Sequence, residues 1–196
     1  YTPPVVEQPV VEQPKEEPKA EVVPEVIKPV VLTEAQKAQQ REAEIKEKVD
    51  QQAMVMKKGE METLDYIFFY RDAAVLRPES RFEVDRLAKL METHPTEKIR
   101  IHGHTNGNDP GKIIKRGPNS TDFFSLENTV EDYGSAKELS ELRANQILEY
   151  LVSKGIDRKR MSIKAWGGKK PLYAVDDEKA EANVRVEIEV VKSDQK

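Results

Sequence analysis

The sequence contains no cysteine, which excludes disulfide bonds, thiolate nucleophiles and cysteine-based zinc sites. It also lacks any apolar run approaching the roughly 20 residues that a membrane-spanning helix needs. Charged residues make up 35% of the chain with a formal net charge of −4, and no basic cluster favours nucleic acid as a partner. What remains is a well-hydrated chain whose chemistry must come from its other side chains.

The N-terminal region is rich in proline: seven of the 12 prolines fall within residues 1–33. Because proline fixes φ and removes a backbone donor, the repeat "VVEQPVVEQP" favours extended polyproline II rather than a packed core. We expect residues 1–33 to be a passive linker, the alternative being a ligand for a proline-binding domain. The chain begins at Tyr1 without methionine or a signal peptide, so we expect it to be part of a longer protein.

Residues 34–60 are expected to connect this linker to a domain through a helix from about 34 to 58. Thr33 and Gln36 form a capping-box signal, and strong helix formers follow without glycine or proline. The helix either packs lightly on the domain or pairs with another helix, which leaves a homo-oligomer open. Its thin apolar stripe consists of Ala38, Ile45, Val49, Ala53 and Met56.

The pattern of residues 61–192 predicts an α+β domain of order βαβαββ, in which helices cover one mixed sheet. "LDYIFFY" has strand length and composition, and a first helix is expected to begin at Pro78. "KIRIHGHT" alternates like a strand, and a polar inserted loop at about 107–134 follows it. Residues 193–196 are a short tail.

The second half of the domain has clear boundaries. A helix is expected from the capping signal at Ser135 to Lys154, where Gly155 supplies the stop. "RMSIKAW" and "NVRVEIEVV" then predict two strands, the second with strict alternation of apolar residues.

Two of the chain's three histidines, His102 and His104, project from one face of the predicted strand. Asp109 or His94 could join them as metal ligands, but zinc needs three or four convergent ligands. Histidines hydrogen-bonded at a strand end are the preferred interpretation. No metal and no cofactor are predicted.

Catalytic motifs are equally weak. "GNDPGKI" is one residue short of the phosphate-binding loop and places isoleucine where a hydroxyl is needed. Ser125, Ser135 and Ser140 lie near acidic residues, but none occupies a G-x-S-x-G turn. The sequence therefore does not predict an enzyme.

Arg143 is the most informative single residue. On a helical wheel it falls in the middle of an apolar stripe, where an unpaired guanidinium would cost several kcal/mol. It must therefore meet either a loop carboxylate such as Asp109 or an anionic ligand. The stripe comprises Leu139, Ile147, Tyr150 and Leu151.

Four blocks of the sequence together resemble the OmpA-like (OmpA, Pal and MotB C-terminal) peptidoglycan-associating domain of bacterial outer-membrane proteins, and they occur in that family's order. The blocks are "YIFFYRDAAVLRPES", "IRIHGHTN", "ELSELRANQILEYLVSKGIDRKRMSIKAWGGKKP" and "NVRVEIEV". The resemblance covers about residues 64–191. It implies noncovalent binding of the diaminopimelate stem peptide, a periplasmic location, and attachment to the outer membrane through an anchor encoded upstream of Tyr1.

The resemblance also implies where the ligand binds. The arginine of the family's L-S-x-x-R-A motif, which clamps a carboxylate of diaminopimelate, corresponds to Arg143. The aspartate that follows G-H-T and faces the amino group is replaced by Asn106, so Asp109 is the candidate for the missing carboxylate. The binding residues implied are Arg143, Asn106, Thr105, Asp109, Asn183 and Arg185.

Three positions depart from the family's pattern. Besides Asn106, Ala136 stands where an asparagine is common, and Val184 replaces the first arginine of N-R-R-V. The substitutions at Asn106 and Val184, together with the large insertion, favour an alternative function, in which the domain assembles with other envelope proteins and its murein binding is weakened or lost.

Overall fold

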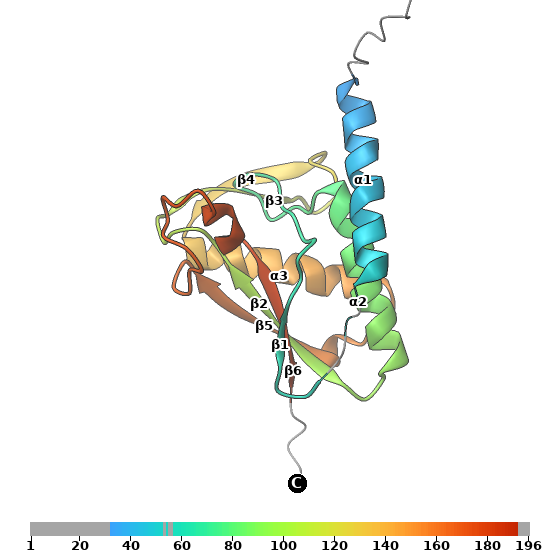
Figure 1. Ribbon diagram of the computed structural model, residues 1–196. Coiled ribbons are helices and arrows are strands. Elements are labelled where there is room, and N and C mark those ends of the chain that lie inside the picture. The colour runs from blue at the N-terminus through green and yellow to red at the C-terminus, as the bar shows by residue number, and fades with distance from the viewer. Residues whose placement is uncertain (1–31, 53, 55–56, 192–196) are drawn as a thin grey trace, which may run out of the picture. The chain divides into compact units, whose positions relative to one another are not determined.

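The computed structural model describes residues 32–52, 54 and 57–191 (Figure 1). The predicted linker, except for Leu32 and Thr33, and the predicted tail lie outside these residues. The chain divides between Leu32 and Thr33, and the fold described below belongs to the second unit. Within the described residues, no helix combines the length and hydropathy needed to cross a membrane.

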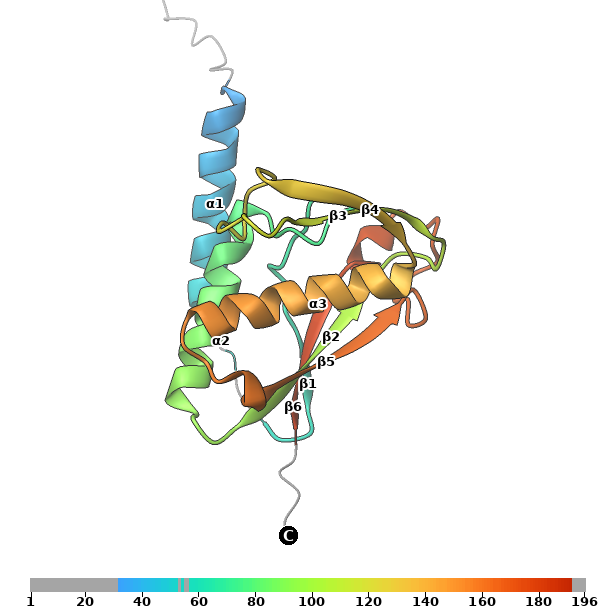
Figure 2. The same ribbon diagram turned by 180° about the vertical axis from the view of Figure 1, so that it is seen from behind.

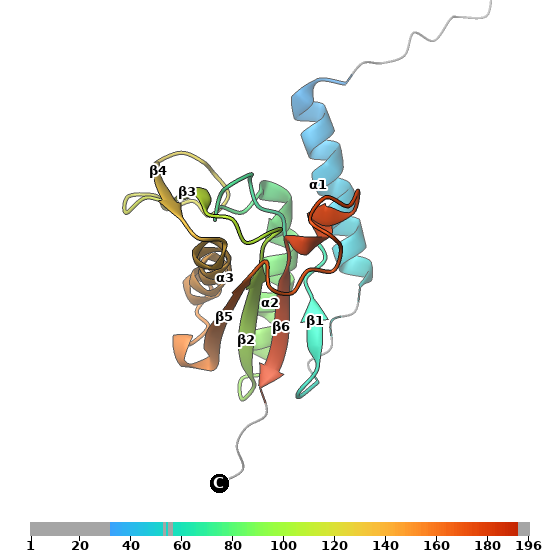
Figure 3. The same ribbon diagram turned by 90° about the vertical axis from the view of Figure 1, so that its left-hand side faces the viewer.

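The central sheet has the strand order β1-β6-β2-β5 (Figure 3). Its strands are β1 (Met61–Thr63), β2 (Lys98–His104), β5 (Met161–Gly167) and β6 (Val186–Val191). β2 runs parallel to β5 and antiparallel to β6, and β1 adds to β6 as an antiparallel edge. The predicted α+β class with a mixed sheet is confirmed.

Two helices, α2 (Arg81–Thr93) and α3 (Ala136–Ser153), contribute to one hydrophobic core with the sheet. The short 3-10 helix η1 (Pro78–Ser80) leads into α2, as Pro78 predicts, while η2 (Arg158–Arg160) precedes β5 and η3 (Ala180–Asn183) precedes β6. The fully buried core side chains include Leu87, Met91, Ile99, Ile101, Ile147 and Leu151.

The prediction of a strand at "LDYIFFY" is wrong, because β1 comprises the earlier residues Met61–Thr63 and only the Leu64 N–H of this segment bonds to β6, at the Val186 carbonyl. The backbone N–H of Phe68 donates to Ser80 Oγ, and the Ser80 hydroxyl donates back to the Phe68 carbonyl. These bonds occupy the backbone N–H and carbonyl of Phe68, which in a strand would pair with a neighbouring strand. The segment becomes an apolar loop with a single bridge between Phe69 and Leu76.

The first helix, α1 (Glu34–Gln51), begins at the predicted capping box but ends before residue 58. Its C-cap Gln52 is extended, and two contacts hold it there. Arg86 donates to the Gln52 carbonyl at 2.7 Å, and the Gln52 side chain donates to Asp65 at 3.1 Å. Tertiary contacts therefore end a helix that local propensity alone would continue.

The same helix packs on the domain. Ile45 and Val49 of its apolar stripe are buried. Arg41 forms an ion pair with the buried Glu79 of η1 at 3.2 Å and lies over the Phe68 ring. Of the two predicted arrangements, light packing on the domain is the one that the structure shows.

The insertion is not a plain loop: it contains an antiparallel hairpin of β3 (Gly111–Arg116) and β4 (Thr129–Gly134), which runs alongside α3 (Figure 2). Ile113 is buried, and Phe124 joins the domain core with its ring edge against Tyr150. These apolar anchors among polar neighbours explain why the segment folds onto the domain.

Candidate functional site

Helix α3 approaches the end of β2 unusually closely, because small residues face each other there. A Cβ at Gly103 would lie 2.1 Å from the backbone oxygen of Ser140 and 3.4 Å from Ala144 Cβ. Gly167 at the end of β5 donates its N–H to Ser140 Oγ at 2.9 Å. This packing brings Arg143, one turn further along α3, beside the loop that follows β2.

Arg143 is 5% exposed, which confirms that it lies on the buried face of its helix. Its Nε donates to the Ala73 carbonyl at 2.9 Å, and its guanidinium lies 5.0 Å from the Phe69 ring centroid. The salt bridge to Asp109 that the sequence suggested does not form, since Asp109 stands exposed in the loop after β2. The Ala73 carbonyl and the Phe69 ring therefore satisfy only part of the hydrogen-bonding capacity and charge of the Arg143 guanidinium.

Burial lowers the pKa of Arg143 to about 10, and the opposing charge of Asp72 limits the decrease. The guanidinium therefore stays charged at neutral pH. Among the described residues, no hydrogen bond reaches its two Nη atoms, nor are they fully enclosed. They can bind a carboxylate in the planar, two-point manner that arginine favours.

A pocket of about 730 Å³ opens in front of Arg143. It brings Arg143 together with Thr105 and Asn106, as the sequence predicts. Asp109, Asn183 and Arg185 are not among its lining residues. The remaining lining residues are Arg41, Ile67, Phe68, Phe69, Tyr70, Arg71, Asp72, Arg77, Leu139, Glu181 and Val184.

Asn183 supports the pocket without lining it. Its buried side chain donates to Asn106 Oδ1 and to the Tyr173 carbonyl, each at 2.9 Å, and accepts from the N–H groups of Leu172 and Tyr173. Asn106 in turn donates to the Val175 carbonyl at 3.1 Å. Asn183 therefore orients Asn106 and fixes the loop before η3.

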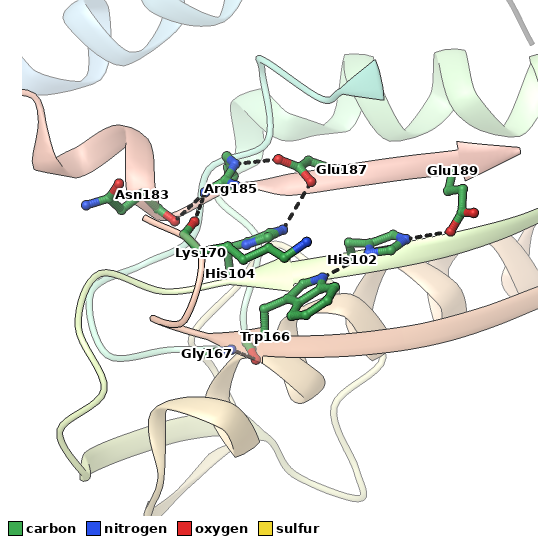
Figure 4. A network of polar contacts seen from close by, with 10 residues as sticks. His102, His104, Trp166, Gly167, Lys170, Asn183, Arg185, Glu187 and Glu189 are labelled. Atoms are coloured by element: carbon green, nitrogen blue, oxygen red, sulfur yellow. Dashed lines mark hydrogen bonds and ion pairs between the residues drawn. The ribbon is translucent and has the colours of Figure 1, made fainter. Parts of the chain in front are cut away.

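Arg185 lies in a polar network on the opposite face of the sheet from α2 and α3 (Figure 4). It donates to Glu187 at 2.7 Å and to the Lys170 carbonyl. Burial would raise the pKa of Glu187, but the hydrogen bond and charge of Arg185 outweigh it and hold that pKa below its ordinary value. The hydrogen bonds that Arg185 donates through its Nε and Nη1 thus go to groups of the protein itself.

Both histidines belong to this network. Trp166 Nε1 donates to His102 Nδ1 at 2.9 Å, which leaves the proton of neutral His102 on Nε2, facing Glu189 at 3.0 Å. His104 Nε2 lies 3.2 Å from Glu187, and burial lowers its pKa to about 4. Within the described part of the chain, no group of three or more histidine, aspartate and glutamate side chains could hold a metal ion.

Sequence reasoning missed Asp72, which lines the pocket close to Arg143. Its φ is +52°, a left-handed conformation that aspartate and asparagine adopt more readily than other side chains. An aspartate directly after the aromatic run "YIFFYR" was the available signal. It indicated a turn but not the direction of the carboxylate.

Curated relatives cover much of the domain. The peptidoglycan-associated lipoprotein of Rhizobium meliloti (strain 1021) is 28% identical over 58% of this chain and 52% of its own length. Outer membrane protein A of Bordetella avium is 31% identical over 64% of this chain and 54% of its own length. The chain thus spans about half the length of these relatives.

Solved structures show the same fold. The periplasmic domain of Helicobacter pylori MotB matches with a TM-score of 0.52 at 18% identity, over 71% of this chain and 87% of that one. The sequence itself matches the OmpA family over residues 68–185, a stretch that includes Arg143, Asn106 and all the pocket-lining residues except Arg41 and Ile67. The chain therefore belongs to the OmpA family.

Proposed function

We propose that this domain binds peptidoglycan noncovalently, by taking the diaminopimelate end of a stem peptide into the pocket at Arg143. The observation that carries the proposal is a buried arginine that lines a pocket and whose two Nη atoms have no hydrogen-bond partner among the described residues. The name of the Rhizobium relative supports the same assignment.

In this proposal Arg143 holds a ligand carboxylate through two parallel N–H···O bonds. Asn106 offers its side-chain oxygen as a weaker acceptor, and Asn183 holds Asn106 in place. The buried Thr105 shapes the turn, because its hydroxyl donates to the Gly107 carbonyl at 3.1 Å. Arg185 acts at a distance by fixing the strand end on which Asn183 depends.

At the level of the whole protein, we propose a noncatalytic anchor. A segment upstream of Tyr1 would fix the protein to the outer membrane, and the proline-rich region would span part of the periplasm. The domain would then tie that membrane to the cell wall.

Co-sedimentation with purified sacculi tests the proposal. The wild-type chain should pellet, whereas Arg143→Ala should stay in the supernatant; Arg158→Ala, on an exposed side chain, is the matched control. Thermal unfolding of each variant separates lost binding from lost folding. A wild-type chain that remains in the supernatant would rule out the proposal.

A protein-assembly role is the second candidate. It is favoured by three exposed apolar side chains in the loop beside Asn106, namely Leu172, Tyr173 and Val175. Such a group suits a protein partner better than a sugar polymer. A stable complex with an envelope protein in the absence of murein would support this role.

A further inference from the structure

The charged side chains that line the pocket include a carboxylate, that of Asp72, which is close enough to Arg143 to affect its pKa. Asp72 lines the same cavity, and its backbone neighbour Ala73 accepts the hydrogen bond from Arg143 Nε at 2.9 Å. Its carboxylate is about half exposed and has only a loose contact of 3.7 Å with the exposed Arg71. Asp72 is therefore available to a ligand that reaches Arg143.

The inserted hairpin holds Asp72 in its conformation. Ile114 of β3 donates its N–H to the Asp72 carbonyl and accepts from Ala74 N–H, both at 2.8 Å. Ala73 pairs with Ile114 as an isolated parallel bridge. Aspartate tolerates a left-handed conformation better than most residues, and these two bonds fix the backbone on either side of Ala73 and so hold Asp72 in it.

The other candidates for an acidic group fit less well. Asn106 is neutral, and its side chain is already bound to Asn183 and to the Val175 carbonyl. Glu79 is buried between Arg41 and Arg77, with ion pairs of 3.2 and 2.7 Å. Glu181 also lines the pocket, but it lies on η3, and among the residues that the structure describes no hydrogen bond or ion pair links it to Arg143. Asp72, by contrast, directly precedes Ala73, whose carbonyl accepts the hydrogen bond from Arg143.

We propose that Asp72, positioned by the β3–β4 hairpin, is the ammonium-binding carboxylate of this pocket, and that Asp72 and Arg143 together select a ligand with a free amino-acid end. Arg143 receives the carboxylate of that end and Asp72 its ammonium group. The identity of the ligand as a stem peptide rests on the proposed function.

The test is calorimetric titration of the full chain with two synthetic peptides. One is L-Ala-γ-D-Glu-meso-diaminopimelate; the other ends in 2-aminopimelate, which keeps both carboxylates of that residue but lacks the free ammonium. Wild type should bind the first peptide more tightly by roughly 10- to 100-fold, the range expected for a charge-assisted hydrogen bond. Asp72→Asn should bind both peptides with equal, weak affinity.

Asp72→Asn removes the charge while keeping a side chain that tolerates φ near +52°, so the fold should persist. Glu92→Gln is the matched control, because it removes an exposed carboxylate that does not line the pocket, and it should retain the wild-type preference. If Asp72→Asn retains that preference too while Arg143→Ala loses binding, the role of Asp72 is wrong and the proposed function stands. If wild type binds neither peptide, both are overturned.

Discussion

Arg143 on α3 donates its Nε–H to the backbone carbonyl of Ala73, 70 residues earlier in the chain, over 2.9 Å. This bond occupies the Nε–H of the guanidinium, whereas no hydrogen bond within the described part of the chain reaches its two Nη atoms, and the side chain lines the pocket. One side chain therefore joins α3 to the loop before α2 and also serves as the expected anion-binding group.

Arg143→Lys should impair both roles, because lysine keeps the charge but lacks the planar fork that bonds Ala73 and would bind a carboxylate. We expect the variant to lose binding to sacculi by roughly 10-fold or more and the free energy of unfolding to fall by about 1–3 kcal/mol. Sedimentation and urea denaturation measure the two effects. Unchanged binding by Arg143→Lys would contradict two-point recognition of a carboxylate.

Gly103→Ala should destabilise the domain strongly. The new Cβ would lie 2.1 Å from the Ser140 carbonyl oxygen, and neither backbone can move without separating α3 from β2. We expect a loss of roughly 3 kcal/mol or more in urea denaturation. Gly111→Ala is the control, because nothing lies within 4 Å of its added Cβ. Equal stability of the two variants would refute the close-packing explanation.

The domain should lose stability as the pH falls from 7 to 5. Burial, followed by the charge of Arg185, lowers the pKa of His104 from 6.5 to about 4, against the opposing effect of Glu187. At pH 5 the His104 side chain is therefore protonated in the unfolded chain but mostly neutral in the native state. This difference lowers the free energy of unfolding by about 2 kcal/mol. Urea denaturation at both pH values measures the loss.

His104→Gln should reduce this pH dependence, and the slope that remains should reflect His102, whose pKa burial also lowers. Burial would raise the pKa values of Glu187 and Glu189, but hydrogen bonds and charges from neighbouring side chains outweigh it and hold both below their ordinary range, so these two carboxyls contribute little to the slope in this window. An unaltered slope in His104→Gln would show that His104 is not the responsible group.

Arg160→Ala should also weaken the fold. Arg160 donates to the carbonyls of Met91, His94 and Glu97 at 2.9, 2.6 and 3.0 Å and so satisfies the C-terminal end of α2. We expect a loss of about 2 kcal/mol in the free energy of unfolding. Arg158→Ala, which removes an exposed ion pair with Glu149, should change it by less than about 0.5 kcal/mol.

The periodicity of apolar residues was enough to predict those helices and strands whose local preference agrees with their tertiary contacts. The alternation in "NVRVEIEVV" correctly predicts that Val186, Ile188 and Val190 of β6 are buried. Local sequence signals gave the wrong structure where tertiary contacts determine the backbone conformation. Ser80 binds the backbone of Phe68 in place of a strand partner, and the bond from Arg86 to the Gln52 carbonyl accompanies the end of α1.

The pocket was predictable to the extent that it depends on short motifs. An arginine in an apolar stripe indicated Arg143, and the G-H-T resemblance indicated Thr105 and Asn106. Asp72 was not predictable, because its position depends on pairing with Ile114, more than 40 residues away, in a segment expected to be a loop. Asn183 and Arg185 were singled out by sequence, but their contacts are with the protein itself.

The strand order has a consequence for how the domain folds. β6, the last of these strands in the sequence, lies between β1 and β2, so the four-stranded sheet cannot form until the residues of β6 are available to pair. The pairing of His102 with Glu187 joins residues 85 positions apart. The entropy cost of closing so long a loop arises before the pairing can stabilise the sheet. A chain that stops before Val186 would therefore leave β1 without its strand partner and expose β2 as a sheet edge, and such a fragment would be prone to aggregate.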